Sequence, residues 1–374
     1  MRGPLRVGID ARELQGRPTG TGRYLRNLLR VWTQQGDDAF FAYFSGGAPD
    51  DPALASPRIS SRPLAPAPHG VLWQEWRLPA AARQDGLDVF FSPAYSCPLR
   101  LDIPRVTAVH DLSFFGWPAD FGLVDGLRRR LLVGSSLRAS TRILACSDFT
   151  CREIASFFPD VKSRLHHVPL GPDDDLAPAP PREVARTQLG LRGPLILTVG
   201  AVLNRRCLPT LLRATARLAP RFPGLTLEVV GENRTHPRLD FEGLSRALGI
   251  LGRVGFTGFL DEAGLAMRYA AADLAVALSE YEGFGLPALE ALSRGVPLLV
   301  SDRPSLNEIF GAAALVVDPQ DDAAVAAAAA RVLSDSSLRR DLQARGRALA
   351  SCYSWQETAR LTREALLGAA IRGN

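Results

Sequence analysis

The stretch from Ser279 to Pro297 constrains the chain most, because it joins two apolar runs through a tight loop and one short helix. The run before it, residues 269–279, and the run after it, residues 296–301, have the composition of buried parallel strands. The helix should begin at Pro287, whose missing N–H costs nothing there, and end near Arg294, before a glycine suited to a left-handed cap. This order of elements favours a parallel α/β sheet.

The loop that enters this helix suits a phosphate-bearing ligand. Gly283 and Gly285 let the backbone approach a ligand without a Cβ in the way, and the unpaired N–H groups at a helix start favour a phosphate or diphosphate. Glu282 lies ahead of the helix and is free to face the same pocket as Glu290. Carboxylates accept hydrogen bonds from the hydroxyl pairs of sugars and riboses. The alternative is that both glutamates are ordinary solvated charges.

The segment EGFGLPALEALSRGVPLLVS resembles the donor-binding signature of the group 1 (family 4) retaining glycosyltransferases, and the resemblance extends over nearly the whole chain. It implies an α/β chain with two Rossmann-like domains that face each other across a cleft, the GT-B fold. It also implies that Glu282 holds the hydroxyls of the transferred sugar. The donor-binding positions that it implies are Gly283, Phe284, Gly285, Leu286 and Glu290.

An acidic, proline-rich stretch sets the domain boundaries. Residues 171–181 lack an apolar face and predict a linker. We therefore expect a first, acceptor-binding domain over 1–170 and a second, nucleotide-sugar-binding domain over 182–353. The resemblance implies that a last helix, within 354–374, returns to the first domain. Residues 48–70 are rich in proline without periodicity, so we expect a loop there.

Two places in the first domain carry candidate residues on the acceptor side. A loop ahead of a helix that should begin near Arg23 contains Gly20 and Gly22, which would let the backbone approach a ligand; a tight turn is the alternative. A later strand ends at His110 and Asp111, where open α/β sheets place residues that contact ligands. The resemblance implies that this pair points into the cleft beside the transferred sugar.

Two arginines follow the first strand of the second domain. The family usually has an arginine-lysine pair at Arg205 and Arg206 that reaches the donor diphosphate, so the second position departs from the pattern. Lys162 is the only lysine among 44 basic residues, which makes replacement of lysine by arginine a simple account. A guanidinium still offers a positive fork to phosphate oxygens. The alternative is that both are surface cations.

Composition narrows the cellular setting. Five scattered cysteines without a C-x-x-C pair argue against a disulfide framework or a zinc site and favour a reducing cytosol. No stretch reaches the roughly eighteen apolar residues of a membrane span, so we expect a cytoplasmic chain, with any membrane contact peripheral and at the inner face. The net charge of +5 fits anionic substrates or an anionic membrane, and the basic segments Arg23–Arg30 and Arg128–Arg130 lie in the acceptor domain.

The favoured function is the transfer of a hexose from a nucleotide diphosphate sugar to a hydroxyl of a glycan or lipid-linked acceptor, with retention. The resemblance implies that the departing diphosphate helps to take the acceptor proton. The catalytic residues that it implies are Glu282, His110, Arg205 and Arg206. Because arginines and a helix start supply the positive charge that the diphosphate needs, we expect no metal and no cofactor. We also expect no nucleic-acid partner.

The donor identity depends on the branch of the family. The patterns IDAR, GTGRY and VHDLSF most resemble the mannosyltransferase-like branch, which favours GDP-mannose, with UDP-sugars as the alternative. Two other classes remain open. A dinucleotide-dependent oxidoreductase would need the full G-x-G-x-x-G fingerprint, which the chain lacks. A non-catalytic nucleotide-sugar-binding protein would keep the glutamates and arginines without turnover.

Overall fold

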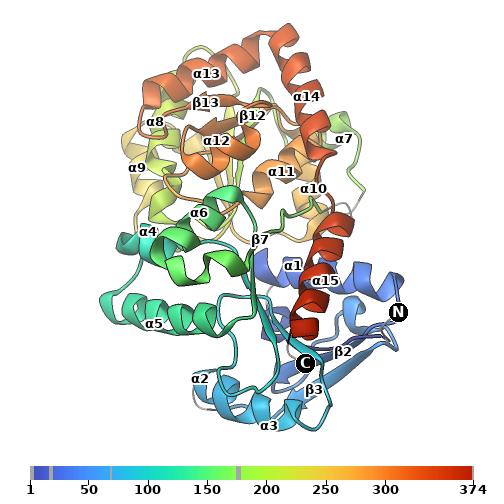
Figure 1. Cartoon of the computed structure of the whole chain (residues 1–374). Coiled ribbons are helices and arrows are strands. Elements are labelled where there is room, and N and C mark those ends of the chain that lie inside the picture. Colours follow the sequence, from blue (N-terminus) through green and yellow to red (C-terminus); the bar gives the residue numbers. More distant parts are fainter. Residues whose placement is uncertain (1–3, 17–19, 68–69, 174–177, 373–374) are drawn as a thin grey trace. The chain divides into compact units, whose positions relative to one another are not determined.

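The computed structural model consists of two compact α/β units (Figure 1). The described residues are 4–16, 20–67, 70–173 and 178–372, so part of the expected linker (174–177) and of the glycine-containing loop (17–19) lie outside them. The first unit comprises Met1–Phe115, Leu123–Gly171 and Ser354–Asn374. The second comprises Gly116–Gly122 and Pro172–Tyr353.

A parallel β-sheet organises the first unit. Within the described residues it has seven strands in the order β3-β2-β1-β4-β5-β6-β7, and neighbours pair in parallel throughout. The strand order reverses between β1 and β4, and ligands of open α/β sheets bind outside the carboxyl ends of the strands at such a point. The strands are β1 (Arg6–Asp10), β2 (Ala39–Ser45), β3 (Ile59–Leu64), β4 (Val89–Ser92), β5 (Arg105–Val109), β6 (Arg142–Ala145) and β7 (Leu165–His167).

Helices connect and cover these strands. They are α1 (Gly20–Gln34), α2 (Gly70–Leu72), a π-helical turn (Trp73–Arg77), α3 (Leu78–Ala82), α4 (Ser113–Gly116), α5 (Leu123–Ala139), α6 (Asp148–Phe157) and α15 (Trp355–Arg372). Short 3-10 turns lie at Arg12–Leu14, Pro52–Leu54 and Pro159–Arg164. Ser147 caps α6 by accepting a hydrogen bond from the N–H of Thr150.

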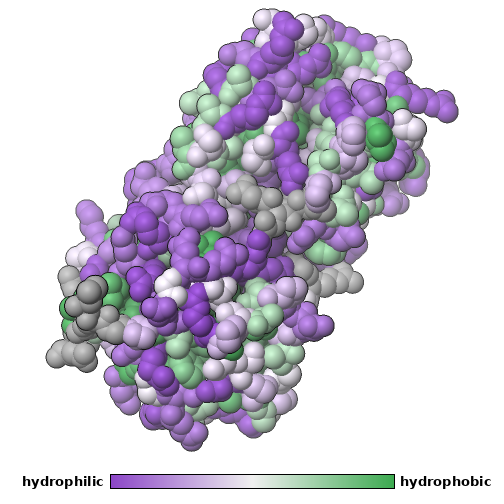
Figure 2. Space-filling view, turned by 90° about the vertical axis from the view of Figure 1, so that its right-hand side faces the viewer, coloured by the Kyte–Doolittle hydropathy of each residue, from purple (hydrophilic) through white to green (hydrophobic). Residues whose placement is uncertain are grey.

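The second unit repeats this plan with a sheet of six strands in the order β10-β9-β8-β11-β12-β13, again parallel throughout in the part described. The strands are β8 (Leu195–Val199), β9 (Thr226–Val230), β10 (Val254–Thr257), β11 (Leu274–Ala277), β12 (Leu298–Ser301) and β13 (Leu315–Val317). One apolar core joins the sheet to α8 and α13, with Leu212, Leu227 and Val325 fully buried. Figure 2 shows one face of the chain, which hydrophilic residues cover for the most part.

The helices of the second unit are mostly short. They are α7 (Arg182–Gln188), α8 (Leu208–Leu218), α9 (Phe241–Ala247), α10 (Glu262–Ala271), α11 (Leu286–Ser293), α12 (Pro304–Phe310), α13 (Asp322–Ser334) and α14 (Ser336–Ala350). Its 3-10 turns lie at Pro118–Asp120, Asn204–Arg206 and Leu251–Arg253.

The expectation of a loop over residues 48–70 is wrong in part, because β3 lies within it. This strand pairs only with β2 among the described strands and therefore forms an edge of the sheet. An edge strand tolerates Pro63, since a proline's missing N–H can fall on the side without a partner strand. Its residues are mostly polar and half-exposed, so no apolar run in the sequence indicates the strand.

The apolar run over residues 269–279 is only partly a strand. Tyr269 and Ala271 end α10, and β11 begins at Leu274. Both helical residues are buried, so the interior face of a helix and a buried strand follow one another without a change in hydrophobicity. A short apolar run does not distinguish the two.

The last helix belongs to the first unit. α15 lies against α1 (Figure 1) and against β4, β5 and β6. The indole Nε1 of Trp32 donates to the carbonyl of Ala359 at 3.0 Å. The buried carboxylate of Asp38 accepts from the Leu5 N–H at 3.0 Å and from Arg363 Nη2 at 3.1 Å. Residues far apart in the chain therefore meet at Asp38.

We predict that Asp38→Asn lowers the free energy of unfolding of the first unit by about 2 kcal/mol, because Arg363 then faces a neutral amide in place of a buried carboxylate. Burial acts to raise the pKa of Asp38, but the bonds from Arg363 and Leu5 outweigh it and hold that pKa below its ordinary value. The stabilisation is therefore present at neutral pH and is lost as pH falls through the lowered pKa. Urea unfolding followed by tryptophan fluorescence measures it. Asp37→Asn, at an exposed neighbour, is the control, and equal losses in both variants would contradict the assignment.

Candidate active site

The loop between β11 and α11 owes its shape to a glycine. Gly285 has a φ of 95° and precedes the first turn of α11, and a Cβ added there would lie 2.7 Å from Leu306 Cδ2. Only glycine combines this left-handed backbone with the close neighbour. No side chain caps the start of α11, so its positive end faces the loop. Gly295, with a φ of 72°, follows the other end of the helix as predicted.

A small cavity of about 30 Å³ lies where the carboxyl ends of β8 and β11 meet the start of α11. The strand order of the second sheet reverses between these two strands, so the cavity occupies a topological switch point. Its volume holds roughly one or two water molecules. The lining residues are Thr198, Val199, Arg206, Ala277, Leu278, Ser279, Glu282, Gly285, Pro287, Ala288 and Leu306.

An ion pair spans this cavity. Arg206 Nε lies 2.8 Å from Glu282 Oε1, and Arg206 Nη1 donates to the Val199 carbonyl at 3.1 Å. The Nε atom has no partner in hydrogen-bond geometry, so its contact with Glu282 is electrostatic. Gly200 makes this arrangement possible, because a Cβ there would collide with the guanidinium. Gly200 directly follows β8, but nothing in the sequence distinguished it as a site residue.

Other predicted residues of this segment lie outside the cavity lining. Arg205 donates from Nε to the Tyr281 carbonyl at 3.0 Å and is buried. Glu290 has no exposed surface and accepts from the Tyr269 hydroxyl at 3.1 Å.

Phe284 is buried too, with its ring edge-on to Phe310 at 6.4 Å between centroids. Two further predicted positions in this segment are the buried Gly283 and the half-buried Leu286. The structure thus brings together Arg206, Glu282 and Gly285.

In the first unit, His110 and Asp111 follow the carboxyl end of β5. His110 Nε2 lies 2.8 Å from the Pro93 carbonyl. A carbonyl only accepts, so Nε2 carries the proton when the ring is neutral, and Nδ1 is the acceptor. Burial lowers the pKa of His110 below its ordinary value, which keeps the ring neutral at pH 7. Asp111 Oδ1 accepts from the N–H and hydroxyl of Ser113 at the start of α4.

The two glycines of the first unit lie inside a helix. α1 begins at Gly20, three positions before the expected start at Arg23, so Gly20 and Gly22 form its first turn. The chain needs neither glycine for a left-handed backbone, since neither has a positive φ. They remain candidates for a close approach of ligand to a helix start, which is a prediction.

Two titratable residues near His110 carried no sequence signal. The Cys146 thiol donates to the His110 carbonyl at 3.0 Å, and burial raises the pKa of Cys146, so the thiol keeps its proton. Burial, followed by the negative charge of Asp111, raises the pKa of Glu153 to about 7. A carboxyl group with such a pKa beside candidate site residues is itself a candidate, because functional sites collect perturbed pKa values.

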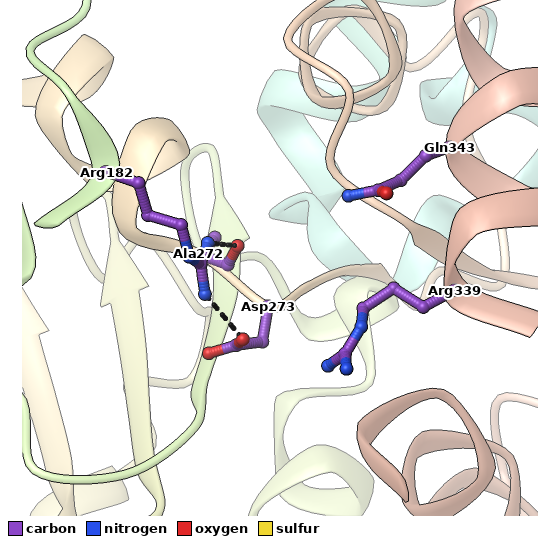
Figure 3. A pocket seen from close by; sticks show the side chains of 5 residues that line it. All are labelled: Arg182, Ala272, Asp273, Arg339 and Gln343. Carbon is purple, nitrogen blue, oxygen red and sulfur yellow. Dashed lines mark hydrogen bonds and ion pairs between the residues drawn. The ribbon is translucent and has the colours of Figure 1, made fainter. Parts of the chain in front are cut away.

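A larger pocket of about 270 Å³ lies elsewhere in the second unit (Figure 3). One side of the pocket is formed by Arg182 and Asp273, with Arg182 Nη2 lying 2.6 Å from Asp273 Oδ1. The other side is formed by Arg339 and Gln343 of α14. Asp273 precedes β11, so this pocket is at the amino edge of the sheet. The glutamate loop, residues 278–285 between β11 and α11, lies at the opposite edge. The pocket contains none of the predicted site residues. Among the described residues, no cluster of histidine, cysteine, aspartate and glutamate has three or more members placed to hold a metal ion.

Family profiles match both halves of the chain. The profile described as "Glycosyltransferase Family 4" matches residues 18–176, and "Glycosyl transferases group 1" matches residues 181–349. The chain is 33% identical over 277 residues to O-antigen chain mannosyltransferase B of Escherichia coli, an alignment that covers 72% of this chain and 71% of the relative. It is 30% identical over 286 residues to a glycogen synthase of Mycobacterium tuberculosis, covering 74% of this chain and 66% of that one.

Solved structures share the fold at low identity. Sucrose-phosphate synthase of Thermosynechococcus elongatus superposes with a TM-score of 0.77 at 22% identity, over 97% of this chain and 100% of the other. HepE of Anabaena, in complex with UDP and glucose, superposes with a TM-score of 0.76 at 19% identity, over 97% of this chain and 99% of the other. These likenesses, with two parallel α/β sheets, confirm the predicted GT-B architecture.

We predict that Glu153→Gln removes a pH dependence from the stability of the first unit. Because the folded pKa is above the ordinary value, the wild type is most stable at acid pH and loses stability as pH rises through about 7. The full shift corresponds to roughly 3 kcal/mol, which partial exposure reduces to about 1 to 2 kcal/mol. In chemical denaturation, the variant should therefore be more stable than wild type at pH 8 and differ little from it at pH 5.

Glu364→Gln, on the exposed side of α15, is the control. A constant difference across this pH range would refute the assignment.

Proposed function

Because this chain belongs to the mannosyltransferase-like branch of the group 1 (family 4) glycosyltransferases, we propose that it transfers mannose from GDP-mannose to a hydroxyl of a glycan or lipid-linked acceptor, with retention. The observation that carries the proposal is the cavity at the switch point of the second sheet. There, Arg206, Glu282 and the uncapped start of α11 converge. A cation, a carboxylate and a helix start are what the diphosphate and hydroxyl groups of a nucleotide sugar require.

The reaction that we propose needs no protein nucleophile. The acceptor oxygen bonds to the anomeric carbon on the face that the diphosphate leaves, the bond from that carbon to the diphosphate oxygen breaks, and the acceptor proton passes to the departing diphosphate. Arg206 and the start of α11 stabilise the negative charge that develops on the leaving group. When Arg206 turns to the diphosphate, Glu282 is released from the ion pair and accepts from the sugar hydroxyls.

Two further residues have proposed roles on the substrates. Glu290 accepts from the ribose hydroxyls, and the Tyr269 hydroxyl that bonds to it orients the carboxylate. His110 meets the transferred sugar as a neutral ring whose Nδ1 accepts a hydroxyl proton. We propose that no divalent metal or other cofactor takes part, since the positive charge for the leaving group comes from Arg206 and the helix dipole.

Mannose is favoured by the E. coli relative named O-antigen chain mannosyltransferase B. A UDP-sugar is the alternative donor, since the HepE structure contains UDP and glucose. The two choices differ in the base and the sugar, whereas Arg206 and the start of α11 serve the diphosphate in either case.

A donor panel tests the proposal without knowledge of the acceptor. The full chain, incubated with GDP-mannose, UDP-glucose and other nucleotide sugars, should slowly hydrolyse GDP-mannose, with and without EDTA. Glu282→Gln should slow this about tenfold to a hundredfold, because a hydrogen bond to a charged acceptor is lost. Glu262→Gln, at an exposed position of α10, should leave the rate unchanged. Consumption of a UDP-sugar with GDP-mannose untouched would reject the donor, and magnesium-reversible loss in EDTA would reject the metal-free reaction.

We propose that α5 rests on an anionic membrane surface at the cytoplasmic face, where a lipid-linked acceptor resides. Four of its side chains are strongly exposed: Leu123 at 94%, Val124 at 84%, Leu127 at 58% and Leu131 at 65%. At about 100° per residue these four fall within one arc of about 100°. Arg128 and Arg130 flank the arc on either side. None of the described helices is both long and apolar enough to span a bilayer.

The charge favours a lipid surface as the occupant of this helix face. Apolar side chains that enter the headgroup boundary between flanking arginines are typical of helices lying in a membrane interface. Each arginine near an anionic surface contributes about 1 kcal/mol. A second copy of the chain is the alternative occupant.

Vesicle binding separates the two occupants. The wild type should sediment with phosphatidylglycerol-containing vesicles at low salt, and binding should fade as salt rises. The double change Leu127→Ser with Leu131→Ser should weaken binding at least about fivefold, since both apolar groups leave the interface. Leu239→Ser, on the second unit, should leave it unchanged. Vesicle binding that is equal in all three proteins would contradict the proposal. If light scattering shows that the double change dissociates a dimer, the occupant of this helix face is a second copy of the chain, and the proposal is also contradicted.

A further inference from the structure

A short segment that follows α4 carries an aspartate close to the glutamate loop. The chain leaves the first unit after Phe115 and returns to it at Leu123, and the segment Gly116–Gly122 belongs with the second unit. Within it, Pro118–Asp120 forms a single 3-10 turn. The side chain of Asp120 is only 3% exposed, which is unusual for a carboxylate.

Asp120 forms a buried ion pair with Arg205. Its Oδ2 accepts from Arg205 Nη1 at 3.1 Å, and the side chain of Arg205 is 8% exposed. The other oxygen, Oδ1, has no hydrogen-bond partner among the described residues. A buried pair contributes little net stability, and an unsatisfied buried oxygen reduces it further. Stability alone therefore does not account for the pair.

Arg205 is in turn bonded to the glutamate loop at three points. Its Nε donates to the Tyr281 carbonyl at 3.0 Å, and its own carbonyl accepts from the Glu280 N–H at 2.8 Å and the Ser279 hydroxyl at 3.2 Å. The Ser279 hydroxyl shares its one proton between the carbonyls of Arg205 and Tyr281, so the loop residues are held on one another and on Arg205. The next residue in the chain is Glu282.

We propose that Asp120 is a positioning residue for sugar transfer: through Arg205 it fixes the loop Ser279–Tyr281 and so directs the Glu282 carboxylate at the transferred sugar. The inference rests on the proposed function for the role of Glu282. It gives the two neighbouring arginines different tasks. Arg206 lines the cavity and meets the diphosphate, whereas Arg205 holds the loop.

The test compares Asp120→Asn and Asp120→Glu with Asp125→Asn, a change at an exposed aspartate of α5. Asp120→Asn keeps the shape and removes the charge. It should lower kcat at least about tenfold, since a bond to a charged group is lost, with the Kd for GDP within about twofold, since Arg206 and α11 are untouched. Hydrogen exchange at the Glu280 amide should become faster. Asp120→Glu should recover part of kcat, and Asp125→Asn should match wild type.

Each other outcome counts against the proposal in a distinguishable way. A loss of GDP affinity as large as the loss of kcat would assign Arg205 to the diphosphate directly. Faster exchange with unchanged kcat would make the pair structural only. If Asp120→Asn does not fold, Arg205→Lys replaces it, because one ammonium group does not reproduce the guanidinium fork, and the same three measurements apply. A wild type that turns over no donor refutes the proposed function, while hydrogen exchange still decides whether Asp120 holds the loop.

Discussion

The ion pair between Arg206 and Glu282 is the contact around which the cavity of the second unit is arranged. It links the turn that follows β8 to the loop that follows β11, and these are the neighbouring strands where the order of the second sheet reverses. Gly200 makes the pair possible, because it leaves room for the guanidinium. Gly285 supplies the left-handed turn from which α11 begins. The same few atoms thus line the small cavity at the switch point, and they are the groups that we propose to bind a nucleotide sugar.

The first unit uses the same sheet architecture with different chemistry. Around the end of β5 it gathers groups that burial keeps uncharged: the His110 ring, with its pKa lowered, and the Cys146 thiol, with its pKa raised. Glu153, whose pKa is raised to about 7, titrates near neutrality. The second unit instead pairs full charges. The same sheet architecture therefore carries paired charges in one unit and buried, uncharged polar groups in the other.

The features that depend on residues adjacent in the chain were predictable from the sequence. Gly295 and the start of α11 were predictable, because helix ends have composition rules that involve a few adjacent residues. The edge strand β3 was not, since an edge strand needs little hydrophobicity. Adjacent arginines cannot be distinguished by sequence either. Arg205 and Arg206 end one 3-10 turn, but their partners lie apart: Tyr281 is in the loop after β11, and Val199 ends β8.

The membership of residues 116–122 bears on how this protein can be divided and recombined. The polypeptide passes between its two units at four peptide bonds, after residues 115, 122, 171 and 353, so neither unit is a single contiguous module. A donor half excised at residue 172, or a chimaera that exchanges residues 172–353 between homologues, separates the buried guanidinium of Arg205 from its carboxylate. Such hybrids inherit an uncompensated interior charge unless the seven-residue insert travels with them.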